Sequence, residues 1–331
     1  MLPNMEFFTL NSAQVSRIGL GTWAIGGSEW GEVSDGDAIA ALLAVFEHGI
    51  NLIDTAPIYG HGRAEELVGN AMRQHGHREK FYVATKAGLE WNAHGVYANS
   101  DPVRLRQEFE DSLRRLGTGY VDLYQIHWPD TTLPVERAAE VLLALYEEGR
   151  IRAIGVSNFS SAQMEAFRNV APLHSNQPPY NLFERAIDED VLPYCREHSI
   201  AVLTYSSLCR SLLAGRLTID TQFAEGDVRR VDPKFQPPRF EQYLQAVARL
   251  DAFAREHYGK RVLELAARWV LDQPGVSAAL WGAKRPDQLN AVDGIFGWKL
   301  NGEAMTEMDA IVRESVPDPV GPEYLTPDVR A

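Results

Sequence analysis

The sequence predicts an α/β fold in which eight parallel strands close into a (β/α)8 barrel, also called a TIM barrel. Short apolar segments of strand length alternate along the chain with amphipathic segments of helix length, and this alternation is typical of a parallel sheet. Eight such units suit a closed barrel better than an open sheet. Because α/β barrels of 331 residues commonly form one domain, we expect a single domain over residues 1–331.

The expected strands are short and rich in aliphatic residues. They comprise residues 15–21, 51–54, 81–85, 121–126, 151–156, 173–176, 200–204 and 276–280. Residues 7–10 and 15–18 are also expected to form a short N-terminal β-hairpin that closes the floor of the barrel.

The expected helices carry start and stop signals. Ser34 and the acidic Asp35 open one helix, which Gly49 ends. Pro102 occupies the first position of another helix, directly after Asp101. The helices span residues 35–48, 64–74, 102 to about 117, 134–148, 160–169, 188–198, 240–257 and 262–272, and one more begins at Pro286.

Net charge and cysteine content exclude several classes of protein. The chain has 32 basic and 45 acidic residues, a net charge of −13, which disfavours binding to nucleic acid or anionic membranes. Its two cysteines make no disulfide framework or metal-ligand spacing, so we expect no metal and a reducing compartment. No signal peptide or membrane-spanning stretch is recognisable, which predicts a cytoplasmic protein. The sequence does not indicate an oligomeric state.

Polar side chains follow the middle strands where each strand ends. Asp54 and then Tyr59 follow the second strand, Lys86 the third and His127 the fourth. Taken singly, each has an ordinary explanation as a helix cap, a solvated lysine, a structural histidine or a packing tyrosine. Active sites of such barrels lie at the carboxyl ends of the strands. The joint placement at successive strand ends therefore predicts an active site.

These four residue types suit the addition of hydride and a proton across a carbonyl group. A tyrosine, with an ordinary pKa near about 10, becomes a better acid beside an ammonium. We expect Asp54 to hold Lys86, and Lys86 to lower the pKa of Tyr59. Tyr59 would then protonate the alkoxide while His127 hydrogen-bonds to the same oxygen.

Two segments favour a nicotinamide cofactor. Residues 19–24 match G-x-G-x-x-A, but a Rossmann fingerprint must open a helix directly, and here the next helix is expected only near Asp35. We instead expect the backbone near Gly21 and Thr22, with the indole of Trp23, to approach a ligand. Gly282 is followed by Lys284 and Arg285, two cations directly before a helix start. A helix N-terminus with two cations suits a ribose 2′-phosphate and favours NADPH over NADH, although a solvated basic turn is the alternative.

These motifs together resemble those of the aldo-keto reductase superfamily over nearly the whole chain. The matching segments are GLGTWAIGG, IDTAPIYG at residues 53–60, AEELVG at 64–69, ATK at 84–86, VDLYQIHW at 121–128, IGVSNF at 154–159, SNQPPY at 175–180 and GAKRPDQL. The resemblance implies a barrel that binds an extended NADPH without a Rossmann domain. It also implies reversible reduction of aldehydes or ketones to alcohols.

The resemblance also implies roles for individual residues. The catalytic tetrad falls on Asp54, Tyr59, Lys86 and His127. Ser157, Asn158 and Gln177 match the residues that hold the carboxamide, and Tyr205 matches the aromatic that stacks on the nicotinamide. Ser206, Leu208 and Arg210 fall in the pyrophosphate-facing segment, and Lys284, Arg285 and Gln288 at the adenosine-phosphate end. Departures from the pattern most common in the family are Ala64, Ser207, Arg210, Ser211 and Val292.

Substrate contacts are expected in loops, which vary freely on this fold. Trp30, Trp91 and Trp128 are candidates to line the pocket, together with an irregular stretch at about residues 206–238 that carries several charges. Two alternatives remain open at this stage. One is a cofactor-binding sensor or regulatory subunit with little turnover, and the other is a barrel isomerase or aldolase that uses Lys86 as a Schiff-base nucleophile.

Overall fold

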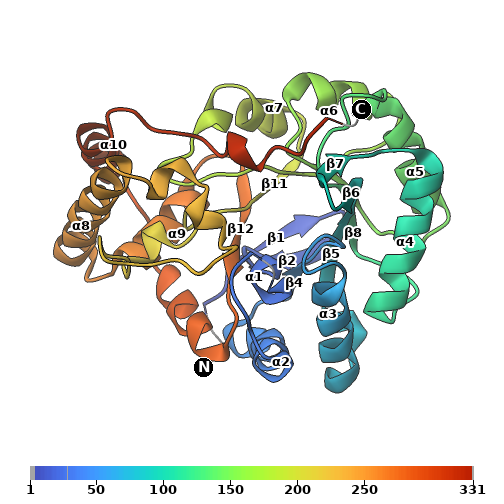
Figure 1. Cartoon of the computed structure of the whole chain (residues 1–331), viewed down its shortest axis with the longest axis horizontal. Coiled ribbons are helices and arrows are strands. Elements are labelled where there is room, and N and C mark those ends of the chain that lie inside the picture. Colours follow the sequence, from blue (N-terminus) through green and yellow to red (C-terminus); the bar gives the residue numbers. More distant parts are fainter. Residues whose placement is uncertain (1–3, 28, 330–331) are drawn as a thin grey trace.

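Eight parallel strands form a closed barrel, and helices surround it (Figure 1). The computed structural model describes residues 4–27 and 29–329. The strands follow one another round the barrel as β3 (Ile18–Gly21), β4 (Leu52–Asp54), β5 (Tyr82–Ala87), β8 (Leu123–Ile126), β9 (Ile154–Ser157), β10 (Ser175–Gln177), β11 (Ala201–Thr204) and β12 (Val276–Gly282). The predicted (β/α)8 barrel is therefore confirmed.

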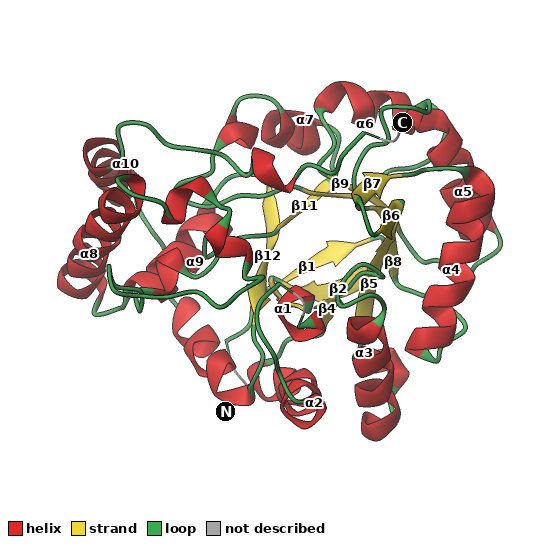
Figure 2. Ribbon diagram, in the orientation of Figure 1, coloured by secondary structure: helices red, strands yellow, loops and turns green. Residues whose placement is uncertain are grey.

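The helices make an outer layer around the strands, as Figure 2 shows. They are α2 (Asp35–Ala44), α3 (Arg63–His75), α4 (Pro102–Leu116), α5 (Val135–Glu147), α6 (Ser161–Arg168), α7 (Val191–Glu197), α8 (Arg239–Tyr258), α9 (Val262–Asp272) and α10 (Gly302–Ser315). The start signals act as expected. Ser34 accepts a hydrogen bond from the N–H of Asp37 at 3.1 Å, and the side chain of Asp101 caps α4 with Pro102 at its first position.

Several predicted boundaries are wrong. The first expected strand is two strands, since residues 15 and 16 belong to β2 (Ala13–Ser16) and β3 begins only at Ile18. The helix expected over residues 35–48 ends at Ala44 and continues as a 3-10 helix, η1 (Val45–His48). The helix that begins at Pro286 is also 3-10, η7 (Pro286–Ile295). Both helix types place residues i and i+3 on one face, so an apolar pattern of this length does not separate them.

The sequence pattern also missed some elements. These are a hairpin of β6 (Leu89–Asn92) and β7 (Gly95–Ala98), the helix α10, and a single helical turn, α1 (Trp23–Gly26). The turn corrects the expectation that no helix follows the first barrel strand before Asp35. It is one turn long and ends at Gly27 in the left-handed conformation, so it does not make the long helix that a Rossmann fingerprint opens.

The N-terminal hairpin plugs the floor of the barrel, as predicted. β1 (Phe7–Leu10) pairs antiparallel with β2. The buried side chains of Leu10 and Val15 belong to one apolar cluster with residues at the beginning of the barrel strands, such as Leu52 and Leu123. The predicted site residues lie at the opposite end, where the strands finish.

The long segment between β11 and α8 is ordered. It contains the 3-10 helices η4 (Leu212–Ala214), η5 (Val228–Arg230) and η6 (Pro233–Phe235). The chain after α10 crosses to the β6–β7 hairpin (Figure 1), where the N–H of Asp328 donates to the carbonyl oxygen of Val96 at 2.9 Å. Both segments therefore lie at the mouth of the barrel.

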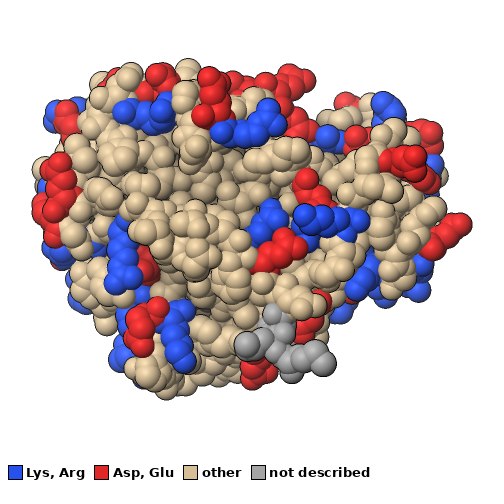
Figure 3. All heavy atoms as spheres, turned by 180° about the vertical axis from the view of Figure 1, so that it is seen from behind, with Lys and Arg blue, Asp and Glu red and all other residues tan. Residues whose placement is uncertain are grey.

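Charges of both signs are interspersed over the face opposite that of Figure 1, and a broad area above and to the left of its centre carries neither (Figure 3). Over residues 4–27 and 29–329, none of the helices combines the length and apolar character needed to cross a membrane.

Helices α3 and α4 approach closely at Gly69, which gives a stability prediction. A Cβ at this position would lie 2.6 Å from the carbonyl oxygen of Arg115 and 2.8 Å from that of Leu116. Gly69→Ala should therefore destabilise the protein by about 1–3 kcal/mol despite the better helix propensity of alanine. The measurement is urea denaturation.

Gly36→Ala, in the first turn of α2, is the matched control. Its Cβ would meet only Ser34 Oγ, at 3.9 Å, so we expect a neutral change or a gain of up to about 1 kcal/mol. Equal effects of the two substitutions would show that the close approach of α3 and α4 is not a constraint.

Candidate active site

Three of the four side chains expected to carry out chemistry meet at the carboxyl ends of β4 and β5. The ammonium of Lys86 donates to Asp54 Oδ2 at 2.6 Å. It also donates to the carbonyl oxygen of Thr55 at 3.0 Å and to Tyr59 Oη at 3.1 Å. The Asp54 carboxylate, 2.6 Å away, favours the ammonium form of Lys86. Both side chains are buried, 0% and 3% exposed.

The turn after β4 presents Tyr59 to this pair. The ring of Tyr59 stacks on Trp23 with centroids 6.3 Å apart. The next residue, Gly60, has a φ of +60°, and a Cβ there would lie 2.3 Å from the carbonyl oxygen of Gly26. Only glycine permits this approach of the turn to α1. The sequence Tyr-Gly thus fixes the phenol against the one-turn helix.

His127 completes the group. It follows β8, and its backbone N–H donates to the backbone carbonyl oxygen of Ala87 at 2.8 Å. Its ring lies edge-on to that of Tyr59, with centroids 5.7 Å apart and an interplanar angle of 83°. The structure thus brings all four residues together at one end of the barrel.

Burial dominates the protonation of the group. It raises the pKa of Tyr59 well above its usual value, and the carboxylates of Asp54 and Glu29 act in the same direction. Burial lowers the pKa of Lys86, which the contact with Asp54 opposes. Burial and the nearby Lys86 hold the pKa of His127 well below its usual value. The expectation of a lowered Tyr59 pKa is therefore wrong, because desolvation of the phenolate raises it.

A second layer of polar contacts lies behind β5. Thr85, next to Lys86, donates to Glu65 at 2.6 Å, and Glu65 accepts from Arg115 at 2.6 Å. Glu65 is fully buried on α3. Since neighbouring strand residues face opposite sides, this contact anchors the outer side of the strand whose inner side carries Lys86.

The residues expected to hold the carboxamide form one network. Ser157 Oγ donates to the carbonyl oxygen of Gln177 at 2.7 Å, and Asn158 donates to Ser157 Oγ at 3.0 Å. Asn158 Oδ1 accepts from Tyr205 Oη at 2.9 Å. Gln177 Nε2 donates to Asp54 Oδ1 at 2.8 Å. The amide of Gln177 therefore links the expected carboxamide site directly to the Lys86–Asp54 pair.

The turn after β11 carries the expected pyrophosphate contacts. Within the described residues, the N–H groups of Leu208, Arg210 and Ser211 have no hydrogen-bond acceptor. Ser206 Oγ accepts from Arg210 at 2.6 Å. The guanidinium of Arg210 is itself buried between Glu184 and Asp232, so a direct phosphate contact would require an exchange of these partners.

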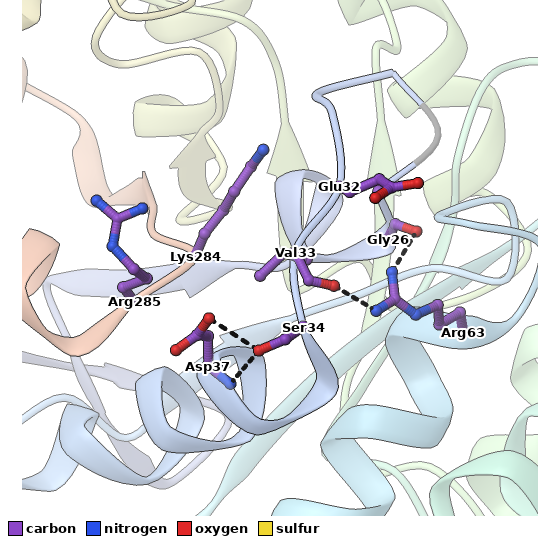
Figure 4. A pocket seen from close by; sticks show the side chains of 9 residues that line it. Gly26, Glu32, Val33, Ser34, Asp37, Arg63, Lys284 and Arg285 are labelled. Carbon is purple, nitrogen blue, oxygen red and sulfur yellow. Dashed lines mark hydrogen bonds between the residues drawn. The ribbon is translucent and has the colours of Figure 1, made fainter.

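The end of β12 lies beside a cavity of about 520 Å³. Figure 4 shows Lys284 and Arg285 on one side of it and Arg63 on the other, with Ser34 and Asp37 between them. The ammonium of Lys284 donates to the carbonyl oxygens of Trp30 and Gly31. Gln288 Oε1 accepts from the N–H groups of Lys284 and Arg285 at 2.7 and 3.3 Å, so it caps η7. Gly282 pairs with Gly21, which brings both expected backbone contacts to one edge.

The expected substrate-pocket tryptophans occupy different positions. Trp30 lies edge-on to Trp23 with centroids 5.2 Å apart, and Trp91 on β6 stacks on His61 at 5.3 Å. Trp128 directly follows His127 and is partly exposed. Trp30 therefore belongs to the aromatic wall beside Tyr59, whereas Trp91 forms a second aromatic pair with His61.

Sequence reasoning missed two residues next to this site. Glu29 accepts from Trp23 Nε1, and Gln125 Oε1 lies 3.4 Å from Gln177 Nε2 inside the barrel. A polar Gln125 in an otherwise apolar strand was a usable signal, because buried amides need partners. Glu29 offered no such signal in the sequence, since exposed glutamates are common in loops.

Comparison with known proteins identifies the relatives of the chain. The model for the Aldo/keto reductase family matches residues 17–313. The chain is 51% identical over 328 residues to "Aldo-keto reductase YhdN" of Bacillus subtilis, covering 98% of this chain and 99% of that protein. It is 35% identical over 292 residues to the "NADH-specific methylglyoxal reductase" of Escherichia coli, covering 83% and 88%.

Solved structures agree. The glycerol dehydrogenase AKR11B4 from Gluconobacter oxydans matches with a TM-score of 0.87 at 46% identity, covering 97% of this chain and 99% of that one. An aldo/keto reductase from Klebsiella pneumoniae, in complex with NADP and acetate, matches with a TM-score of 0.70 at 30% identity, covering 94% and 96%. Relatives of this chain thus include an NADP-bound enzyme and an NADH-specific one. The chain belongs to the aldo/keto reductase family and is an oxidoreductase that reduces carbonyl groups.

Proposed function

We propose that this reductase uses NADPH to convert an aldehyde or ketone into an alcohol, with Tyr59 as the proton donor. The observation that carries the assignment is the buried Lys86 ammonium, 2.6 Å from Asp54 Oδ2 and 3.1 Å from Tyr59 Oη. When bound, the nicotinamide supplies the hydride. Tyr59 gives its proton to the carbonyl oxygen, and a neutral His127 offers an N–H to the same atom. In the reverse direction, the Tyr59 phenolate accepts the proton of the alcohol.

The residues at the barrel mouth fit a polar, anionic cofactor. Thr22 Oγ1 is buried and, among the described residues, has no hydrogen-bond partner. The unpaired N–H groups of Leu208, Arg210 and Ser211 suit phosphate oxygens. Ser157, Asn158 and Gln177 would hold the carboxamide, and Tyr205 would stack on the ring, as the family pattern implies.

The preference for NADPH rests on Lys284 and Arg285, which suit a 2′-phosphate. Two features limit the preference. Glu32 and Asp37 line the same cavity, and Lys284 is engaged by carbonyl oxygens of residues 30 and 31. We therefore propose a moderate preference for NADPH rather than an exclusion of NADH.

Trp23 lies 5.2 Å from Trp30 and 6.3 Å from Tyr59, centroid to centroid, so an aromatic wall lies beside the phenol. The relative from Gluconobacter oxydans is named a glycerol dehydrogenase. We propose short polyols and the corresponding hydroxy-aldehydes or hydroxy-ketones as substrates. The two buried free cysteines, Cys195 and Cys209, are compatible with a reducing, cytoplasmic location.

The geometry disfavours the Schiff-base alternative. A nucleophilic lysine must be a neutral amine that reaches the substrate, whereas Lys86 is fully buried and its Nζ lies 2.6 Å from the Asp54 carboxylate. The sensor alternative differs in turnover, because a sensor would bind the cofactor and reduce little or no substrate. Steady-state assays with carbonyls and polyols, each with NADPH and NADH, test the proposal. Tight NADPH binding with no turnover on any of them would favour a sensor instead.

Tyr59→Phe should retain NADPH affinity and lose most of the turnover. The ring still packs against Trp23, but the transferable proton is gone, and a positioned acid contributes roughly 10²–10⁴-fold. Stopped-flow reduction and fluorescence titration measure the two properties separately. Near-parent turnover of the variant would remove Tyr59 from the acid role.

The hydride-transfer step of reduction should be independent of pH between about pH 6 and about pH 9. Tyr59, whose pKa is raised, stays protonated below that pKa, and His127, whose pKa is lowered, stays neutral above its own. Single-turnover rates with deuterated NADPH isolate this step. A fall in rate toward high pH within the range, absent from Tyr59→Phe, would contradict the raised pKa of Tyr59.

Replacing Lys284 and Arg285 together by Ala should weaken NADPH far more than NADH. Two charge-assisted contacts are worth roughly 1.5–3 kcal/mol each, so the relative loss should be about a hundredfold or more. Fluorescence titration with both cofactors provides the measurement. Lys299→Ala removes an exposed lysine that follows η7, the helix that Lys284 and Arg285 precede. It controls for a general loss of positive charge. Equal small losses for the two cofactors would leave the 2′-phosphate without its proposed ligands.

A further inference from the structure

Four charged side chains are buried together beside the turn after β11 and take no part in the proton chemistry. This buried charge cluster consists of Glu184, Arg210, Asp232 and Lys234, whose side chains are at most 2% exposed. Arg210 pairs with Glu184 and, at 2.7 Å, with Asp232. Lys234 lies 2.8 Å from Glu184 and 3.6 Å from Asp232. Two positive and two negative charges make the cluster neutral.

The buried charge cluster joins three parts of the mouth. Arg210 belongs to the β11 turn, which we define as residues 206–211, and Asp232 and Lys234 belong to the long loop before α8. The C-terminal segment, residues 317–329, reaches the cluster from the other side. Tyr324 Oη donates to Asp232 Oδ2 at 3.0 Å, and Lys234 Nζ donates to the carbonyl oxygen of Gly321 at 2.9 Å.

The β11 turn is strained. Ser206, Cys209, Arg210 and Ser211 have φ values of +58°, +45°, +50° and +74°. Non-glycine residues adopt such values only where the surroundings enforce them. Two contacts do so here, because Arg210 donates to Ser206 Oγ at 2.6 Å, and Asn181 donates to the carbonyl oxygen of Ser206 at 3.0 Å. The same Asn181 donates to Glu184 at 2.6 Å. The cluster thus holds both ends of the turn.

We propose that Arg210 and Tyr324 are positioning residues, and that the buried charge cluster and the C-terminal segment keep the β11 turn in the shape that receives the cofactor pyrophosphate. This inference rests on the proposed cofactor function. Buried ion pairs add little net stability compared with apolar packing, but breaking one partner is costly. Such a cluster therefore specifies one geometry. The geometry here leaves the N–H groups of Leu208, Arg210 and Ser211 without described acceptors, as an anion-binding turn requires.

Tyr324→Phe tests whether the C-terminal segment holds the β11 turn in place. It is the smallest such change, since it removes one hydroxyl and keeps the ring. We expect the Kd for NADPH to rise roughly tenfold, because one hydrogen bond to a charged group is lost. The Kd for 2′-phospho-ADP-ribose should rise equally, since it retains the pyrophosphate. The Kd for adenosine 2′-phosphate, which lacks the pyrophosphate, should not change. The kcat at saturating NADPH should stay at the parent value, because the catalytic group is untouched.

Arg210→Lys is the second variant, and it keeps the charge but cannot bond Glu184, Asp232 and Ser206 together. It should weaken NADPH more than Tyr324→Phe does. Tyr194→Phe is the matched control, because it loses a hydroxyl that bonds Glu165 and Arg168 on α6 and no residue of the buried charge cluster.

The outcomes separate the two proposals. Unchanged NADPH affinity in both variants would overturn the positioning role, as would an equal loss for adenosine 2′-phosphate, which would indicate general loosening. If the parent protein bound neither NADPH nor NADH, the proposed function would fail first, and the positioning role with it.

Discussion

A fully buried ammonium lies at the centre of the site, and the arrangement around it depends on its neutralisation. An unpaired charge at this depth would cost several kcal/mol. Lys86 avoids this cost through Asp54, the carbonyl oxygen of Thr55 and Tyr59. The three acceptors come from the end of β4 and the turn that follows it. The register of β4 with β5, in which Asp54 pairs with Ala84, places Lys86 two residues beyond that pair. The register of β4 with β5 and the geometry of the turn after β4 thus together determine the arrangement around Lys86.

The same principle recurs around the mouth of the barrel. Behind β5, the buried Glu65 is satisfied by Thr85 and Arg115. Beside β11, the buried charge cluster balances its own charges. In each case a buried charged group has fixed partners on other elements, and few alternative arrangements satisfy it. The mouth therefore has defined geometry although it is built from connecting segments, which are ordinarily the mobile part of this fold.

Residue pattern alone predicts much of this, and topology explains why. Residues at the ends of successive parallel strands must meet at one rim, so Asp54, Lys86 and His127 could be placed together without knowledge of distances. The partners of Arg210 could not, because Glu184 and Asp232 are 26 and 22 residues away in the sequence and lie in irregular segments. Local periodicity says nothing about such pairs.

Other elements escaped prediction for related reasons. The one-turn helix α1 is too short to give an apolar period. The 3-10 helix η7 places residues i and i+3 on one face, as an α-helix does, so its apolar pattern does not reveal its type. The course of the C-terminal segment depends on contacts such as that of Tyr324 with Asp232. These contacts are set by tertiary packing and leave no local mark in the sequence.

In the proposed mechanism, the role of Lys86 changes during the reaction. Before the reaction, burial and Asp54 favour the neutral phenol of Tyr59, so the proton that Tyr59 is proposed to donate is present. Once that proton has moved to the substrate oxygen, a phenolate remains in the same buried space, where an ammonium 3.1 Å away interacts with it strongly. Lys86 therefore stabilises the state after transfer more than the state before it, which is the condition for lowering a barrier. The cation assists the acid by binding its conjugate base, while burial sets the resting protonation.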